Sequence, residues 1–262
     1  MTKPLGVNKV TLPIASLRAM APDTRYALLM LGLMLNEANW LRKLLLPATV
    51  SIGDSPEGQA SFGLTVLMAT TLAGKIHEGW NLVETEKLGS ILTAAGLPAE
   101  LQQLRASISG RLTSDTFLRV RNNVAFHYPK RVFDFKKLDP HLDDDATVIY
   151  AAEEGHGNVF SHLSSLAGIE PLAAIDGHID YLTALGNVWN EVMEVAGLYC
   201  EFISESMAAI IKDNVPDTKC ERFSVPNAPE GVDQVTKFYS RGPESLEALR
   251  KLSDEHEKEQ SK

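Results

Sequence analysis

The fold is decided by the stretch PEGQASFGLTVLMATTLAGKIHEGWNLVETEKL, which occupies residues 56–88. Its apolar residues recur at alternating steps of four and three, the spacing of one face of a helix. They are Phe62, Val66, Ala69, Ala73, Ile76, Trp80 and Val83. Ser55 stands at the cap position and Pro56 at the first helical position, where a proline costs no hydrogen bond. The pattern predicts one long helix packed on another helix of the same chain or, less favoured, on a partner protomer.

Further long helices flank this stretch on both sides. Asp23 caps a helix predicted over 24–46, which is apolar nearly all round in its first half and is expected to stop at Pro47. A second long helix is predicted over 171–212, where the four-three spacing runs unbroken. Its apolar positions are Ile175, Ile179, Leu182, Gly186, Trp189, Met193, Ala196, Cys200, Ile203, Met207 and Ile210. At 1.5 Å per residue this helix is about 60 Å long, which indicates an extended bundle or a dimer seam.

Shorter elements fill the middle of the chain. A weak helical piece is expected within 85–98, a helix over 98–109 that Gly110 breaks, and a further helix that begins near Ser114 and ends at Pro129. Residues 147–152 and 159–163 read as the two strands of a β-hairpin around a polar turn. Residues 1–20 read as an extended arm or a short edge strand.

These elements predict a mainly α fold, a helical bundle with long antiparallel helices and a small β-hairpin insertion. One helical domain is expected over 1–215, with the hairpin near 147–163. Residues 216–262 are expected to form a loop-rich connector and a charged helical tail at 244–259.

Bulk composition limits the function. The formal net charge of −9 gives the chain no general attraction for nucleic acid, so such binding requires a local basic patch. Cys200 and Cys220 fit no metal spacing and read as reduced thiols. The longest apolar run, at 26–35, is shorter than the about 20 residues that span a bilayer. With no leader pattern at residue 1, the expected location is cytoplasmic, without a membrane partner.

One local basic patch exists. The eight basic residues at 101–139 outnumber three acidic ones, so this basic island carries +5 and the rest of the chain −14. Such an island is either a phosphate footprint or a set of solvated helix faces. The island contains Arg111, Arg119, Lys130 and Arg131, which are the candidate phosphate contacts.

Inside the island lies the stretch RNNVAFHYP, residues 121–129. Arg121 offers a planar cationic fork for phosphate oxygens, and His127 titrates near neutral pH. Asn123 is four residues before His127 and can orient its ring. An imidazole that moves a proton and a cation at the phosphorus centre are the minimum for metal-free RNA cleavage. On a continuous helix Arg121 and His127 project about 120° apart, so a two-fold dimer is the natural way to complete the site.

The order arginine, polar residue, four further residues and histidine resembles the HEPN superfamily, whose domains are helical. The resemblance implies a metal-independent endoribonuclease that needs no cofactor, acts on RNA as a homodimer and serves in toxin–antitoxin or anti-phage defence, with an antitoxin protein as partner. It implies that Arg121 and His127 are catalytic and that Asn122 supports them, with Asn123 and Tyr128 beside the site. Some of these toxins carry a tyrosine two residues after the histidine, whereas Tyr128 follows His127 directly here.

Three other interpretations stay open. In the first, the chain is a non-catalytic helical RNA-binding or protein-interaction dimer that uses the basic island as its contact. In the second, Arg121 and His127 are structural and pair with acids inside the bundle. His77 and Glu78 read most simply as an exposed polar pair, although a bundle can aim them at the motif. No HExxH, P-loop or Gly-x-Ser-x-Gly pattern occurs, and no metal site is expected.

Overall fold

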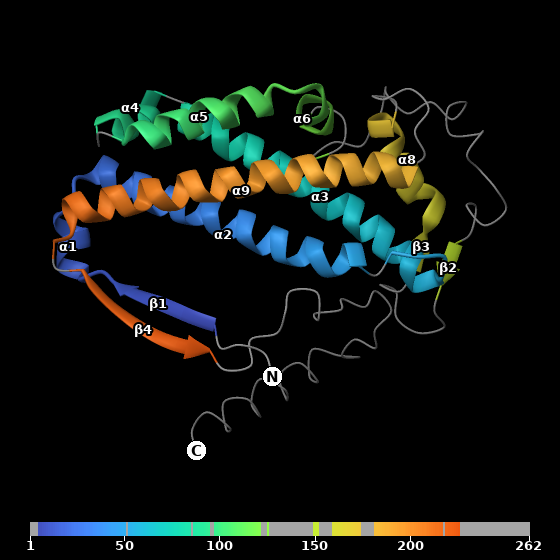
Figure 1. The fold of residues 1–262 in the computed structure, drawn as a ribbon, viewed down its shortest axis with the longest axis horizontal. Coiled ribbons are helices and arrows are strands. Elements are labelled where there is room, and N and C mark those ends of the chain that lie inside the picture. The colour runs from blue at the N-terminus through green and yellow to red at the C-terminus, as the bar shows by residue number, and fades with distance from the viewer. Residues whose placement is uncertain are drawn as a thin grey trace, which may run out of the picture.

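A computed structural model describes residues 5–50, 52–84, 86–94, 97–121, 125, 149–151, 159–173, 181–216 and 218–225. Three long helices, α2, α3 and α9, form the centre, with α4, α5 and α6 along one side and a two-stranded ribbon on the other (Figure 1). In chain order the elements are β1 (Leu5–Thr11), α1 (Ile14–Ala19), α2 (Pro22–Val50), α3 (Pro56–Glu84), α4 (Glu86–Ala94), α5 (Ala99–Leu112), α6 (Asp115–Val120), β2 (Ile149–Ala151), β3 (Val159–Ser161), α8 (His162–Ala173), α9 (Tyr181–Asn214) and β4 (Lys219–Val225). The mainly α fold class with long helices and a small hairpin is confirmed.

Helix α3 is the central element that its sequence predicts. The Ser55 hydroxyl accepts a hydrogen bond from the Gly58 N–H at 3.1 Å, so the predicted cap is confirmed. All seven apolar positions of the predicted stripe are buried. The helix packs on α2, α8 and α9 of the same chain. The intramolecular interpretation of the four-three spacing is therefore confirmed for this helix.

Helix α2 runs past the proline that was expected to stop it. Pro47 lies inside the helix, one turn before its end at Val50. Pro47 has no N–H to donate to the carbonyl oxygen one turn earlier, so one backbone hydrogen bond is missing near the end of the helix. The hydroxyl of Thr49 donates to the Leu45 carbonyl oxygen at 2.9 Å and stabilises this turn. The predicted end at Pro47 was therefore wrong.

Helix α9 begins later than predicted and buries a different edge in its first turns, whereas Ala196, Cys200, Ile203 and Ile210 are buried as expected. Residues 162–173, including Pro171, belong to the separate helix α8, and α9 begins at Tyr181. Ile175 and Ile179 lie outside the described residues. Leu182 was expected in the core but is 60% exposed, because the buried face runs through Tyr181, Leu185 and Val188. Two adjacent faces of α9 carry apolar residues at the four-three spacing. Packing against α2 and α3 determines which of these faces is buried.

Helix α5 also outlasts its predicted end. It continues through Gly110 to Leu112, because an isolated glycine costs a helix only about 1 kcal/mol. The indole Nε1 of Trp80 donates to the Ser109 hydroxyl at 3.0 Å and ties α5 to α3. The chain then turns at Thr113 and starts α6, which is capped by Ser114 as expected.

Two small antiparallel sheets complete the fold. Strands β2 and β3 pair from Ile149↔Ser161 to Ala151↔Val159, which confirms the predicted hairpin, although helix α8 starts at His162. Strand β1 confirms part of the extended arm or edge strand expected over residues 1–20, whereas Ile14–Ala19 form the helix α1. The partner of β1 is β4, in the part of the chain expected to be only connector, with Leu5 opposite Val225 and Thr11 opposite Lys219. Residues 226–262, with the predicted tail, lie outside the described residues.

One connected apolar core joins the helices. It includes residues from Met20, between α1 and α2, to Val215 just after α9. The described core ends near residue 215, and β4 lies beyond it in the chain.

Candidate functional site

Arg121 is positioned by the short helix α6. The Ser114 hydroxyl accepts a hydrogen bond from the Phe117 N–H at 3.4 Å and donates one to Glu191 of α9 at 2.6 Å. Phe117 and Val120 are fully buried, and α6 packs on α3. Because Arg121 follows Val120 directly at the end of this anchored helix, its backbone has a fixed place beside α3.

The Arg121 guanidinium faces Glu78 of α3. Its Nη2 lies 3.7 Å from Glu78 Oε1, and the two side chains are 42% and 53% exposed. An ion pair this exposed contributes about 0–1 kcal/mol, so it orients the guanidinium without holding it strongly. A phosphate can therefore replace the carboxylate as the partner of Arg121.

His77 belongs to the same cluster. The amide nitrogen of Asn81 lies 3.2 Å from His77 Nδ1, one helical turn further along α3. The contact is within hydrogen-bond distance, so Asn81 helps to orient the His77 ring.

The charge around His77 favours the neutral ring. Partial burial lowers the pKa of His77, the positive charge of Arg121 lowers it further, and the carboxylate of Glu78 opposes both effects. An imidazole with a lowered pKa is unprotonated at neutral pH and can accept a proton there. We refer to His77, Glu78, Asn81 and Arg121 as the α3–α6 cluster.

The other candidate site residues divide into two groups. Arg119 lies on α6 and is partly buried. Arg111 forms an ion pair with Glu194 of α9 at 2.6 Å, so a phosphate would have to compete with that carboxylate. Asn122, Asn123, His127, Tyr128, Lys130 and Arg131 lie outside the described residues.

Acidic side chains accompany the described arginines of the basic island. Besides Arg111 and Arg121, Arg105 also has a carboxylate partner, Glu84, at 3.0 Å. These carboxylates come from α3 and α9, whereas the arginines come from α5 and the end of α6. The island is therefore less positive in three dimensions than its sequence alone indicates.

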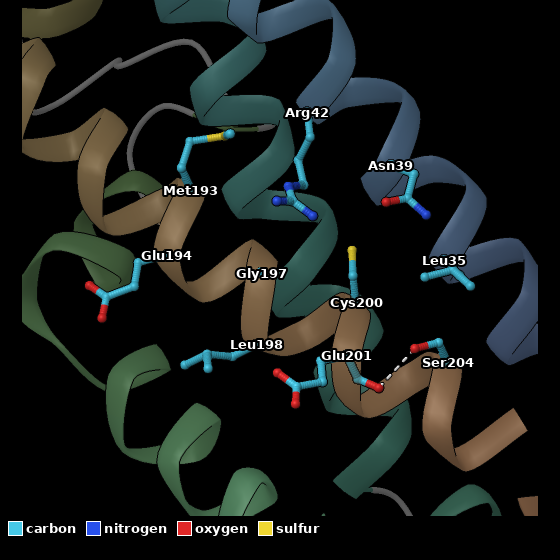
Figure 2. Close-up of a pocket in the computed structure, with 10 residues that line it drawn as sticks. All are labelled: Leu35, Asn39, Arg42, Met193, Glu194, Gly197, Leu198, Cys200, Glu201 and Ser204. Atoms are coloured by element: carbon cyan, nitrogen blue, oxygen red, sulfur yellow. Dashed lines mark hydrogen bonds between the residues drawn. The ribbon is translucent and has the colours of Figure 1, made fainter. Parts of the chain in front are cut away.

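Two grooves open between the long helices. The first lies between α2 and α3, has a volume of about 360 Å³ and is lined by Glu78 and Asn81 of the cluster. The second, between α2 and α9, is wider at about 620 Å³ and contains no residue of the cluster. Figure 2 shows the Arg42 guanidinium and the Cys200 thiol directed into the same space of this second groove. Burial raises the pKa of Cys200, and Arg42 opposes this by a hydrogen bond and by its charge.

Among the described residues, no three histidine, cysteine or acidic side chains lie close enough to hold a metal ion. No described helix has the length and the continuous apolar character needed to cross a membrane.

Comparison of the chain with protein-family models, curated proteins and solved structures gives no match.

Proposed function

We propose that the chain is a metal-independent endoribonuclease of HEPN type that acts as a homodimer, with a role in toxin–antitoxin or anti-phage defence. The observation that supports this most is the α3–α6 cluster. It places an always-charged guanidinium beside an imidazole whose pKa is lowered, at the surface of the bundle. A cation for the phosphate and a neutral base are the two groups that RNA cleavage without metal requires.

The chemistry follows from these groups. A neutral imidazole removes the proton of a ribose 2′-hydroxyl, the 2′-oxygen attacks the adjacent phosphorus, and the bond from phosphorus to the 5′-oxygen breaks. The 5′-oxygen takes up a proton, and the other product ends in a 2′,3′-cyclic phosphate. Arg121 stabilises the charge on the phosphate oxygens during the attack. His127, which the motif contributes, and His77 are the imidazoles available for the two proton transfers.

An exposed apolar face on α2 supports the homodimer. Tyr26, Leu29, Trp40 and Leu44 are 39%, 64%, 66% and 46% exposed. They lie three, eleven and four residues apart, which places them on one face of the helix. A second copy that covers this face would bury apolar surface that is otherwise in water.

Alanine substitutions test the proposal. Cleavage of a labelled RNA in the presence of a chelator is expected to fall about 10²-fold or more in Arg121→Ala and in His127→Ala. Sedimentation should show that both variants remain dimers. Arg18→Ala, an exposed arginine on α1, is the matched control and should cleave normally. Cleavage that survives both changes would reject the nuclease.

A non-catalytic RNA-binding or protein-interaction dimer is the second candidate. The exposed face of α2 favours a protein-interaction dimer, and the carboxylate partners of Arg105, Arg111 and Arg121 compete with phosphate. If the island contacts RNA without cleaving it, the RNA binds with a steep dependence on salt and is recovered intact.

A further inference from the structure

The groove between α2 and α3 has the volume and the lining residues of a small-molecule binding site. Its volume of about 360 Å³ lies within the usual range for ligand pockets, about 300–1,000 Å³. Apolar side chains form its walls, and these are Met30, Leu33, Met34 and Leu82. Such walls suit the two faces of a flat ring.

A tyrosine from a third helix reaches this groove. Tyr199 of α9 lines it, although the residue as a whole is only 1% exposed. Its ring packs on Trp80 at 6.3 Å between centroids. Burial raises the pKa of Tyr199 well above its usual value, so the hydroxyl keeps its proton and can donate a hydrogen bond.

Gly79 makes room for that hydroxyl. A Cβ at this position would overlap the Tyr199 hydroxyl and would stand 3.1 Å from Met34 Cε. The absence of a side chain at residue 79 is therefore what allows α9 to deliver a polar group to a groove between two other helices.

A charged pair supplies complementary hydrogen-bonding groups. Lys75 Nζ lies 2.9 Å from Glu37 Oε1, and both residues line the groove. The side chains are 42% and 38% exposed, so both can also reach a ligand. The groove thus presents a carboxylate acceptor and an ammonium donor next to each other.

The groove continues into the α3–α6 cluster. Glu78 and Asn81 line it, and they are also the partners of Arg121 and His77. A nucleotide whose phosphate lies at Arg121 is therefore next to Glu78, a residue that also lines the groove.

Guanine fits these groups better than the other bases. Its N1–H and N2 amino group can donate together to one carboxylate, and its O6 can accept from an ammonium. Adenine presents an acceptor N1 to the carboxylate and an amino group to the ammonium, so both contacts become unfavourable. Bases in single-stranded RNA are unpaired, so this edge is open to recognition.

We infer that the α2–α3 groove is a guanine-binding subsite for single-stranded RNA, in which Glu37 and Lys75 read the base edge and Tyr199 supports it. This inference rests on the proposed ribonuclease function. It makes the nuclease selective for a guanine next to the cleaved bond.

Calorimetric binding of 3′-GMP, 3′-AMP, 3′-CMP and 3′-UMP to the full chain tests the inference. 3′-GMP should bind about tenfold more tightly than 3′-AMP, as one good bidentate pair provides. Glu37→Gln should remove this preference, because an amide no longer accepts both donors. Tyr199→Phe keeps the ring against Trp80 and should weaken 3′-GMP about three- to tenfold.

Matched variants outside the groove are Glu205→Gln on α9 and Tyr150→Phe on β2, and both should bind 3′-GMP like the wild type. Equal binding of the four nucleotides, or unchanged 3′-GMP binding in both groove variants, overturns the inference. RNA cleavage without guanine selectivity would reject the groove and keep the nuclease. Selective 3′-GMP binding without RNA cleavage would reject the nuclease and keep a guanine site.

Discussion

At the scale of single residues, Gly79 decides how closely α9 approaches α3. Its missing side chain accommodates the Tyr199 hydroxyl, and Met34 of α2 closes over the same spot. Three helices therefore meet at one glycine. The surrounding residues are buried, so little room exists into which a methyl group could be moved.

Gly79→Ala should destabilise the fold. Overpacking costs about 1–3 kcal/mol, and the gain in helix propensity offsets only about 0.5–1 kcal/mol of it. Thermal unfolding should show Tm lowered by several degrees, since about 1 kcal/mol corresponds to about 2–4 °C at this chain length.

Gly110→Ala is the control, because a Cβ at Gly110 of α5 meets no atom within 4 Å. That change should raise the stability by about 0.5–1 kcal/mol. Equal effects of the two substitutions would contradict the role given to Gly79.

Several residue-level features could be predicted from the sequence, and others could not. The buried stripe from Phe62 to Val83 is correct because its spacing places every member on one face. Leu182 was misplaced because two adjacent faces of α9 are both apolar. The requirement for a glycine at residue 79 comes from its contact with Tyr199, which is 120 residues away in the sequence. No local sequence pattern predicts a contact between residues so far apart.

At the scale of elements, the 6-residue helix α6 controls the position of Arg121. Isolated helices this short are unstable, so α6 depends on its cap and on the burial of Phe117 and Val120. Ser114 has two roles, because its hydroxyl caps α6 and also donates a hydrogen bond to Glu191 of α9.

Ser114→Ala should therefore weaken both stability and cleavage. Loss of an N-cap costs about 0.5–2 kcal/mol, and Glu191 loses a hydrogen-bond donor as well. Urea denaturation should show the lower stability, and the cleavage rate should fall because Arg121 is less well held.

Ser107→Ala, an exposed serine on α5, is the comparison and should change neither quantity. Stability lowered equally in the two variants would show that the cap does not anchor α6.

The elements show why the site was only partly foreseeable. Ser114 is a recognisable cap, and Arg121 stands out in a basic stretch. The ion pair of Arg121 with Glu78 exists because α6 packs on α3. Such a contact cannot be predicted from the sequence of either helix alone. His77 and Glu78 thus looked like an exposed pair, and only the packing brings them to Arg121.

At the scale of the whole molecule, β1 and β4 join the two sides of the chain. No turn signal announces this pairing, because the strands are separated by the entire helical bundle. The sequence therefore predicts the nearby β2–β3 hairpin and misses this distant ladder. Closing so long a loop costs entropy, so the pairing depends on the helical bundle to bring the two strands together.

The direction of this ladder determines how the molecule responds to mechanical force. Leu5 and Val225 face each other at the same end of the ladder, so tension applied through the two chain ends separates the strands one pair at a time. Each strand has 7 residues, and full separation should lengthen the molecule by about 50 Å, at about 3.6 Å per residue. In an optical trap this step should come first and at low force, before the bundle opens. Rupture of the bundle without that early step would mean that the strands do not bear the load.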